Sequence, residues 1–122
     1  MAKTILVVDD SSSMRQVVGM ALKGGGYDVI DACDGKDALA KLDGRKLHLI
    51  ISDVNMPNMD GIAFVKAAKL LPAYKFTPVI MLTTEAGETK KKEGQDAGVR
   101  AWVVKPFQPA QLLLAVSKLV LA

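Results

Sequence analysis

The fold is decided first by ILVVDD at residues 5–10, where four successive apolar side chains are followed by two aspartates. An apolar run without polar alternation is typical of a strand that is buried on both faces of a parallel sheet. Similar runs occur at 49–51, 79–82 and 102–104, and a shorter strand is expected at 27–30. The sequence therefore predicts five parallel strands.

Helical patterns lie between these strands. Apolar residues recur on one helical face within 14–22, 38–42 and 112–120. Strands that alternate with helices predict an α/β fold with a single doubly wound parallel sheet, flanked by five helices and joined by right-handed crossovers. A chain of this size fits the flavodoxin-like strand order 2-1-3-4-5.

Residues suited to helix ends agree with this division. Ser11 to Ser13 and Asp34 are suited to N-caps, glycines 24–26 end the first helix, and Pro109 fits the first turn of the last helix. The segment 87–97 offers almost no apolar face, so a helix there should be weakly attached. It is either a helix that frays or a surface that a switch can reposition.

Length and composition indicate one domain over residues 1–122, without an output domain. Half of the residues are hydrophobic, and the single Cys33 cannot form an internal disulfide. No signal-peptide pattern or long apolar run occurs, so the expected location is the cytoplasm and no membrane partner is expected.

The net charge of +3 does not indicate a nucleic-acid partner. Much of the excess lies in Lys90 to Lys92, aromatic residues are few, and no groove-reading motif is present. The lysine run is interpreted first as a solvated helix face. A basic rim that attracts acidic partner segments is the alternative.

Polar side chains follow the predicted strands. Doubly wound sheets bind ligands beyond the carboxyl ends of their strands, where the strand order reverses. The first strand ends in Asp9 and Asp10 and the third in Asp53, so three carboxylates should meet there. Two carboxylates about 4 Å apart repel by roughly 4 kcal/mol at an effective dielectric near 20, so a cation is needed. Oxygen ligands without His or Cys suit a hard cation, and a site with few protein ligands favours Mg²⁺.

A hydroxyl and an ammonium are expected at the same edge. The fourth strand ends in Thr83 and the fifth in Lys105. A lone lysine beside an acid is by default a structural salt bridge. Three acids, a metal, a lysine and a hydroxyl together indicate phosphoryl chemistry.

Four motifs at four strand ends carry a resemblance to a known family. They are VVDD at 7–10, ISDVNMPNMDG at 51–61, PVIMLTTE at 78–85 and AWVVKPF at 101–107. In this order and spacing, the chain resembles the receiver domains of two-component response regulators. The runs DDSSSMR and TTEAG are most similar to the chemotaxis members of that family.

The resemblance implies a role for each site residue. Asp53 matches the phosphoacceptor, and Lys105 matches the lysine that contacts the phosphoryl group. For Mg²⁺, the family's direct ligand is matched by Asp10, its water-mediated ligand by Asp9, and its backbone carbonyl ligand by Asn55. The switch residues are Thr83 and Trp102, and Lys105-Pro106 matches the family's cis peptide.

Two residues depart from the family's usual pattern. Trp102 stands where the chemotaxis members usually carry Tyr, so the ring is larger and lacks the phenolic hydroxyl. Thr84 replaces a usually smaller residue beside the switch, and its β-branch could hinder movement of the ring.

The resemblance implies a switch and not a turnover enzyme. A histidine kinase, chemotaxis-type by resemblance, donates a phosphoryl group to Asp53, and the domain itself catalyses its transfer and loss. The surface of the fourth helix, fifth strand and fifth helix then binds a target, the flagellar motor switch protein in chemotaxis, and a phosphatase is a further partner. A phosphate sink or a phosphorelay intermediate is the alternative, and a monomer is expected.

An enzyme or carrier on the same fold is disfavoured. A phosphatase of the aspartyl-phosphate type would need a second acid two residues after Asp53, where Asn55 stands, and a flavin or nucleotide carrier would need a glycine loop after the first strand. The remaining candidates have structural interpretations: Met14, Met56 and Met59 as packing, His48 as an ordinary residue at a strand start, and Pro57, Asn58 and Gly61 as turn residues.

Overall fold

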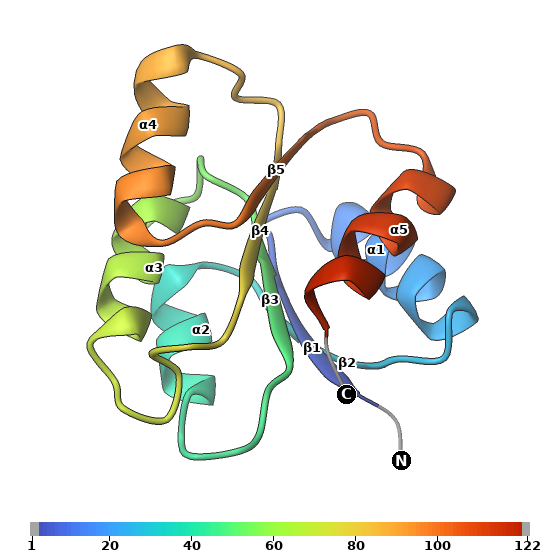
Figure 1. The fold of residues 1–122 in the computed structure, drawn as a ribbon, viewed down its shortest axis with the longest axis horizontal. Helices are drawn as coiled ribbons and strands as arrows, with labels where there is room; N and C mark the ends of the chain where they lie inside the picture. Colours follow the sequence, from blue (N-terminus) through green and yellow to red (C-terminus); the bar gives the residue numbers. More distant parts are fainter. Residues whose placement is uncertain (1–2, 121–122) are drawn as a thin grey trace.

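The computed structural model describes residues 3–120, in which five strands and five helices alternate (Figure 1). The strands are β1 (Thr4–Val8), β2 (Asp28–Ala32), β3 (Leu49–Ser52), β4 (Val79–Thr83) and β5 (Ala101–Val104). The helices are α1 (Ser12–Gly24), α2 (Gly35–Lys41), α3 (Gly61–Lys69), α4 (Glu88–Ala97) and α5 (Pro109–Leu119). All neighbouring strands are parallel, in the order β2-β1-β3-β4-β5, which confirms the predicted topology.

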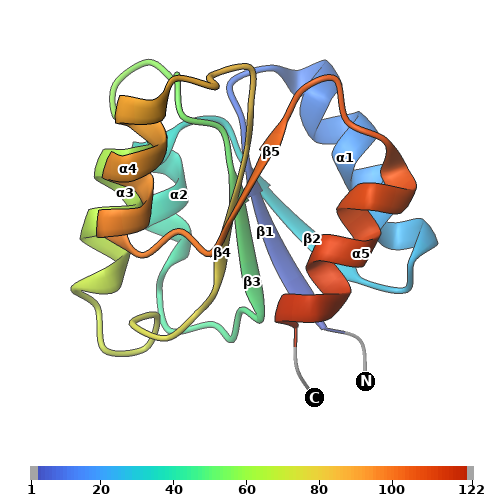
Figure 2. The same ribbon diagram turned by 45° about the horizontal axis from the view of Figure 1, so that its top comes forward.

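The sheet separates two apolar cores. One face is covered by α2, α3 and α4 and the other by α1 and α5 (Figures 1 and 2). Successive β1 residues alternate between these cores: Leu6 and Val8 lie in the first, Ile5 and Val7 in the second. Because both faces are covered, the strand reads as an unbroken apolar run.

The residues predicted to start or terminate helices lie at helix ends in the structure. Ser11 accepts a hydrogen bond from the Met14 amide at 3.2 Å and caps α1, and Asp34 accepts one from the Asp37 amide at 2.8 Å and caps α2. The first helix ends at Gly24, and Gly26 follows with a φ of 91°. Pro109 is the first residue of α5.

The sequence did not locate α3 and located α4 closely. Asp60 caps α3 by accepting a hydrogen bond from the Ala63 amide at 2.8 Å. Gly87 caps α4 without a side-chain hydrogen bond, and Gly94 is the one buried residue of that helix. The predicted poor apolar face of α4 is thus confirmed.

Charged residues are segregated between the two ends of the sheet. Basic residues precede four strands: Lys3, Lys46, Lys75 and Arg100. Acidic residues follow four strands: Asp9 with Asp10, Asp34, Asp53 and Glu85. Because the strands are parallel, the carboxyl-terminal end of the sheet is acidic and the opposite end is basic. Within residues 3–120, no helix combines the length and apolar character needed to cross a bilayer.

Candidate functional site

Three aspartates converge at the carboxyl-terminal edge of the sheet, as predicted. Val8 of β1 pairs with Ser52 of β3, so Asp9 and Asp53 leave neighbouring strands at the same level. Each of the three carboxylates of Asp9, Asp10 and Asp53 has an oxygen within 4.8 Å of the others. Asp9 and Asp53 are buried, with 4 % and 9 % exposed, whereas Asp10 is exposed.

Lys105 joins two of these acids. Its Nζ lies 2.7 Å from Asp9 Oδ2 and 3.0 Å from Asp53 Oδ2, and its side chain is 10 % exposed. Burial lowers the pKa of the Lys105 ammonium, but hydrogen bonds to Asp9 and Asp53 outweigh burial and hold its pKa above the ordinary value. The lysine therefore stays charged at neutral pH. When all three carboxylates are ionised, a net charge of −2 is left in the cluster.

The oxygens of the cluster suit a divalent hard cation. Asp9 Oδ1 accepts a hydrogen bond from the Ser11 amide at 2.9 Å, and Asp53 Oδ1 accepts one from the Val54 amide at 2.7 Å. These amides fix both carboxylates, while Asp10 faces solvent. Asn55 is exposed two residues after Asp53, at the start of the loop that leads to α3. A set of oxygen ligands with an uncompensated charge of −2 fits Mg²⁺.

Gly61 has a role that the sequence analysis missed. A Cβ at this position would overlap the backbone carbonyl oxygen of Asp53. The Gly61 amide also donates to the Val54 carbonyl at 2.8 Å. The first residue of α3 therefore lies directly against the Asp53 backbone, which only glycine permits. Its interpretation as a simple turn residue was incomplete.

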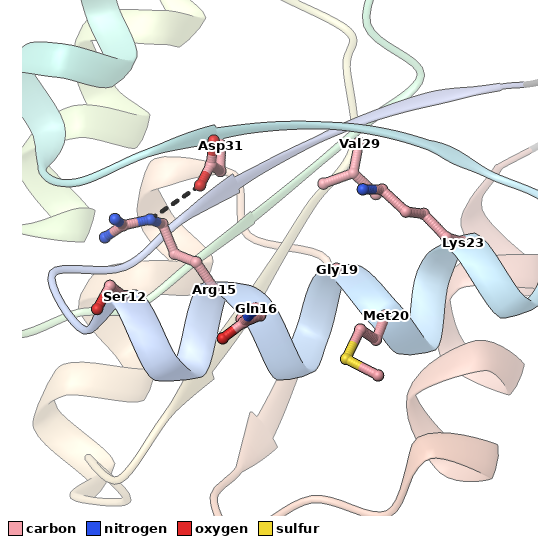
Figure 3. Close-up of a pocket in the computed structure, with 8 residues that line it drawn as sticks. All are labelled: Ser12, Arg15, Gln16, Gly19, Met20, Lys23, Val29 and Asp31. Atoms are coloured by element: carbon pink, nitrogen blue, oxygen red, sulfur yellow. Dashed lines mark hydrogen bonds and ion pairs between the residues drawn. The ribbon is translucent and has the colours of Figure 1, made fainter.

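Arg15 was also missed, although it lies within the quoted run DDSSSMR. Its Nη1 donates to the Asp9 carbonyl at 2.7 Å, and its Nε donates to Asp31 Oδ2 at 3.0 Å. Figure 3 shows Arg15 on α1 reaching across a pocket to Asp31 on β2. The guanidinium thus ties α1 and the edge strand to the residue that begins the acid cluster.

The loop between Asp53 and α3 is fastened to α2. The side-chain Nδ2 of Asn58 donates to Asp34 Oδ2 at 2.8 Å. Asn58 has a φ of 68°, which Asn tolerates better than most residues. A Cβ at Gly35 would lie 2.7 Å from the Met59 backbone oxygen, so this loop packs closely on the start of α2.

Thr83 and Trp102 are linked through one residue. Thr83 is fully buried, and its hydroxyl accepts a hydrogen bond from the Glu85 amide at 3.1 Å. The Trp102 indole N–H donates to the Glu85 carbonyl at 2.8 Å. Thr84 is exposed. Thr83 and Trp102 are therefore both hydrogen-bonded to the backbone of Glu85, in the loop after β4.

The residues given structural interpretations lie as expected. Met14, Met56 and Met59 are partly buried against the cores. His48 accepts a hydrogen bond from the Thr4 amide at 3.0 Å, away from the acid cluster. Burial, together with the charges of Lys3 and Lys46, lowers the pKa of His48. The peptide bond between Lys105 and Pro106 is cis.

The sequence that forms the acid cluster, Lys105 and this sheet matches the model of a known protein family. The family model described as the response regulator receiver domain matches residues 5–117. The chain belongs to this family. The receiver domain is thereby established for residues 5–117, a range that includes Asp9, Asp10, Asp53 and Lys105.

Three individual proteins show which members of the family this chain resembles. The receiver domain is 42 % identical to the chemotaxis protein CheY1 of Helicobacter pylori over 110 residues, which cover 88 % of this chain and 89 % of that protein. It is 39 % identical to protein PilG of Pseudomonas aeruginosa over 112 residues, which cover 92 % and 83 %. The structure of the chemotaxis protein CheY4 of Vibrio cholerae matches with a TM-score of 0.93 and 48 % identity, over 98 % of this chain and 99 % of that one. This is a CheY-like receiver domain.

Proposed function

We propose that this receiver domain is a phosphorylation switch that accepts a phosphoryl group from a histidine kinase on Asp53. The observation that carries the proposal is the nearly buried Asp53 carboxylate, held by the Val54 amide and Lys105 beside two further acids. Asp9, Asp10 and Asp53, with the Asn55 carbonyl, would hold Mg²⁺. When bound, the ion supplies positive charge that neutralises the transferring group.

The chain's own residues account for the nucleophile and part of the charge. An Asp53 carboxylate oxygen attacks the phosphorus of a phosphohistidine. The O–P bond forms as the N–P bond breaks, and the imidazole leaves with the electron pair and takes a proton. The Lys105 ammonium, 3.0 Å from Asp53 Oδ2, is placed to contact the new phosphoryl oxygens. Water later attacks the phosphorus, so that a new O–P bond forms as the bond to Asp53 breaks, the carboxylate is restored and inorganic phosphate leaves. The proposed product of this cycle is the change of state between uptake and loss, so the domain is a switch and not a turnover enzyme.

The proposed output passes through Thr83 and Trp102. An aspartyl phosphate carries about two negative charges and brings new acceptor oxygens near the end of β4. The Thr83 hydroxyl can donate to such an oxygen, and Glu85 would then follow because its amide is bonded to that hydroxyl. Trp102 is bonded to the Glu85 carbonyl, so the change reaches the surface formed by α4, β5 and α5.

Intact mass after incubation with acetyl phosphate tests the chemistry. We expect one added phosphoryl group that requires both Mg²⁺ and Asp53, and that is absent in Asp53→Ala. Asp28→Ala is the matched control, because Asp28 is exposed at the start of the edge strand. A short-lived adduct would still release inorganic phosphate with the same two requirements. Neither adduct nor phosphate release, beside a receiver domain that labels, would overturn the proposal.

The proposed target is the flagellar motor switch protein of a chemotaxis pathway, because CheY1 and CheY4 are chemotaxis proteins. A phosphate sink or phosphorelay intermediate in another two-component pathway is the second candidate, since PilG, at 39 % identity, is not named as a chemotaxis protein. Pull-down with and without a phosphoryl mimic separates them, because a sink needs no phosphorylation-dependent target. The proposal further places a monomer in the cytoplasm, with a phosphatase as a further partner.

A further inference from the structure

Helix α4 has an unusual attachment to the rest of the molecule. Its sequence ETKKKEGQDA provides almost no apolar side chains, and Gly94 is its one buried residue. The neighbour of Gly94 is the ring of Trp102 on β5. The helix is therefore held at its middle by a contact between a residue without a side chain and the largest side chain of the molecule.

The contact leaves no room for another atom. A Cβ at position 94 would lie 2.8 Å from Cζ3 and 3.5 Å from Cε3 of Trp102, and 3.6 Å from Cγ2 of Val99. Carbon atoms in proteins pack at about 3.5–4.0 Å, so the first distance is a steric overlap. The Trp102 ring cannot move aside as the end of a flexible side chain would, because the ring is rigid and its indole N–H is hydrogen-bonded to the Glu85 carbonyl.

Glycine at this position is not explained by helix formation. Gly94 lies in the interior of α4, where glycine is less favourable than alanine because it loses more backbone freedom. Its φ is not in the left-handed region, in contrast to that of Gly98, which follows the helix. The remaining reason for glycine is the space that the Trp102 ring occupies.

We infer that Gly94 is a positioning residue that seats the Trp102 ring under α4, so that the ring and this helix can change position only together. The role of this seat in signalling rests on the proposed function. Trp102 is bonded at one edge to the loop after β4 and packed at the other against Gly94. A ring that leaves the seat uncovers the only buried residue of α4, and the helix loses its packing contact with Trp102, although Ala97 still packs against the core.

A thermodynamic cycle tests the seat itself. We expect Gly94→Ala to lower the melting temperature in the native chain, although Gly→Ala in a helix normally raises it by about 3 °C. In the Trp102→Ala background the same substitution should raise it, because the ring is gone. Gly24→Ala is the matched control, since no atom lies within 4 Å of its added Cβ, and it should raise the melting temperature in both backgrounds. An equal rise for Gly94→Ala in both backgrounds would overturn the seat.

Fluorescence tests the coupling, because Trp102 is the only tryptophan. We expect Gly94→Ala to increase quenching of the native emission by acrylamide and to reduce the change caused by Mg²⁺ with beryllofluoride. Phosphoryl uptake by intact mass should stay unchanged, because Gly94 does not contact Asp53, Lys105 or Thr83. An unaltered quenching constant in Gly94→Ala would refute the inference. If the native chain itself took up no phosphoryl group, the proposed function would be refuted instead.

Discussion

At the scale of single residues, the site depends on contacts to backbone atoms as much as on its charged side chains. Gly61 lies against the Asp53 carbonyl oxygen, and Arg15 donates to the Asp9 carbonyl. Spacing along strands could predict Asp9, Asp10, Asp53 and Lys105, because each follows an apolar run. It could not predict Gly61 or Arg15, since a contact to a carbonyl leaves no pattern in the sequence.

Gly61 provides a test at this scale. We expect Gly61→Ala to lower the free energy of unfolding by about 3 kcal/mol, at the upper end of the cost of overpacking, because its Cβ would overlap a backbone atom. Phosphoryl uptake should fall as well, because Asp53 must move. Denaturant titration and intact mass provide the two measurements.

Gly24→Ala is the control for this substitution. Its added Cβ has open space at the end of α1, so it should raise stability by roughly 0.5–1 kcal/mol. If Gly61→Ala proved as stable as the native chain, the close approach of α3 to Asp53 would not hold in solution.

At the scale of elements, the site loop and α2 form one unit. Asp34 caps α2 through the Asp37 amide and also accepts a hydrogen bond from Asn58 in the loop after β3. These two hydrogen bonds, the Asp37 amide first, hold the pKa of Asp34 below its ordinary value. The same carboxylate therefore sets the start of a helix and the path of the site loop.

A pH titration tests this unit. Because the pKa of Asp34 is lower in the folded state, its ionised form stabilises the protein above about pH 4, and this stabilisation is lost as the pH falls through the folded pKa. We expect Asp34→Ala to lower the melting temperature at pH 7 and to have a shrinking effect below pH 4. Asp28→Ala, which removes an exposed carboxylate that caps no helix, is the matched control. A deficit that stayed constant down to pH 2 would show that the charge of Asp34 does not matter.

The elements also show where sequence patterns lose information. The edge strand β2 spans 28–32 instead of the predicted 27–30, because Asp28 and Asp31 are exposed and interrupt the apolar run. The third helix had no predicted range. Its buried residues Gly61, Ile62, Phe64, Val65 and Ala68 recur at helical spacing on one face, so the pattern was present in the sequence and was overlooked.

At the scale of the whole molecule, the five-stranded order followed from the sequence, because buried runs and intervening helices left few topologies to consider. The position of the acid cluster followed from that order. Its hydrogen bonds did not, since they depend on the level at which neighbouring strands end. The pairing of Val8 with Ser52 sets that level and brings Asp9 beside Asp53.

Stability should respond to Mg²⁺ across the whole domain. At ten times its dissociation constant, the ion should raise the free energy of unfolding by about 1.4 kcal/mol, because it binds only the folded cluster. Asp10→Asn should abolish this gain and raise stability without Mg²⁺, because one of three mutually repelling carboxylates is removed. Asp28→Asn should keep the gain. The measurement is the melting temperature at a series of Mg²⁺ concentrations. A melting temperature that did not change with Mg²⁺ concentration would count against the cation site.

The segregation of charge between the two ends of the sheet affects how a charged partner approaches the molecule. Basic residues precede four of the strands and acidic residues follow four, with Lys105 after β5 as the exception, so this arrangement gives an electric dipole along the strand axis. The field of a charged partner exerts a torque on such a dipole and turns one pole toward the partner before contact. More collisions then begin in a productive orientation. This advantage fades as added salt shortens the range of the field, which is about 8 Å at physiological ionic strength.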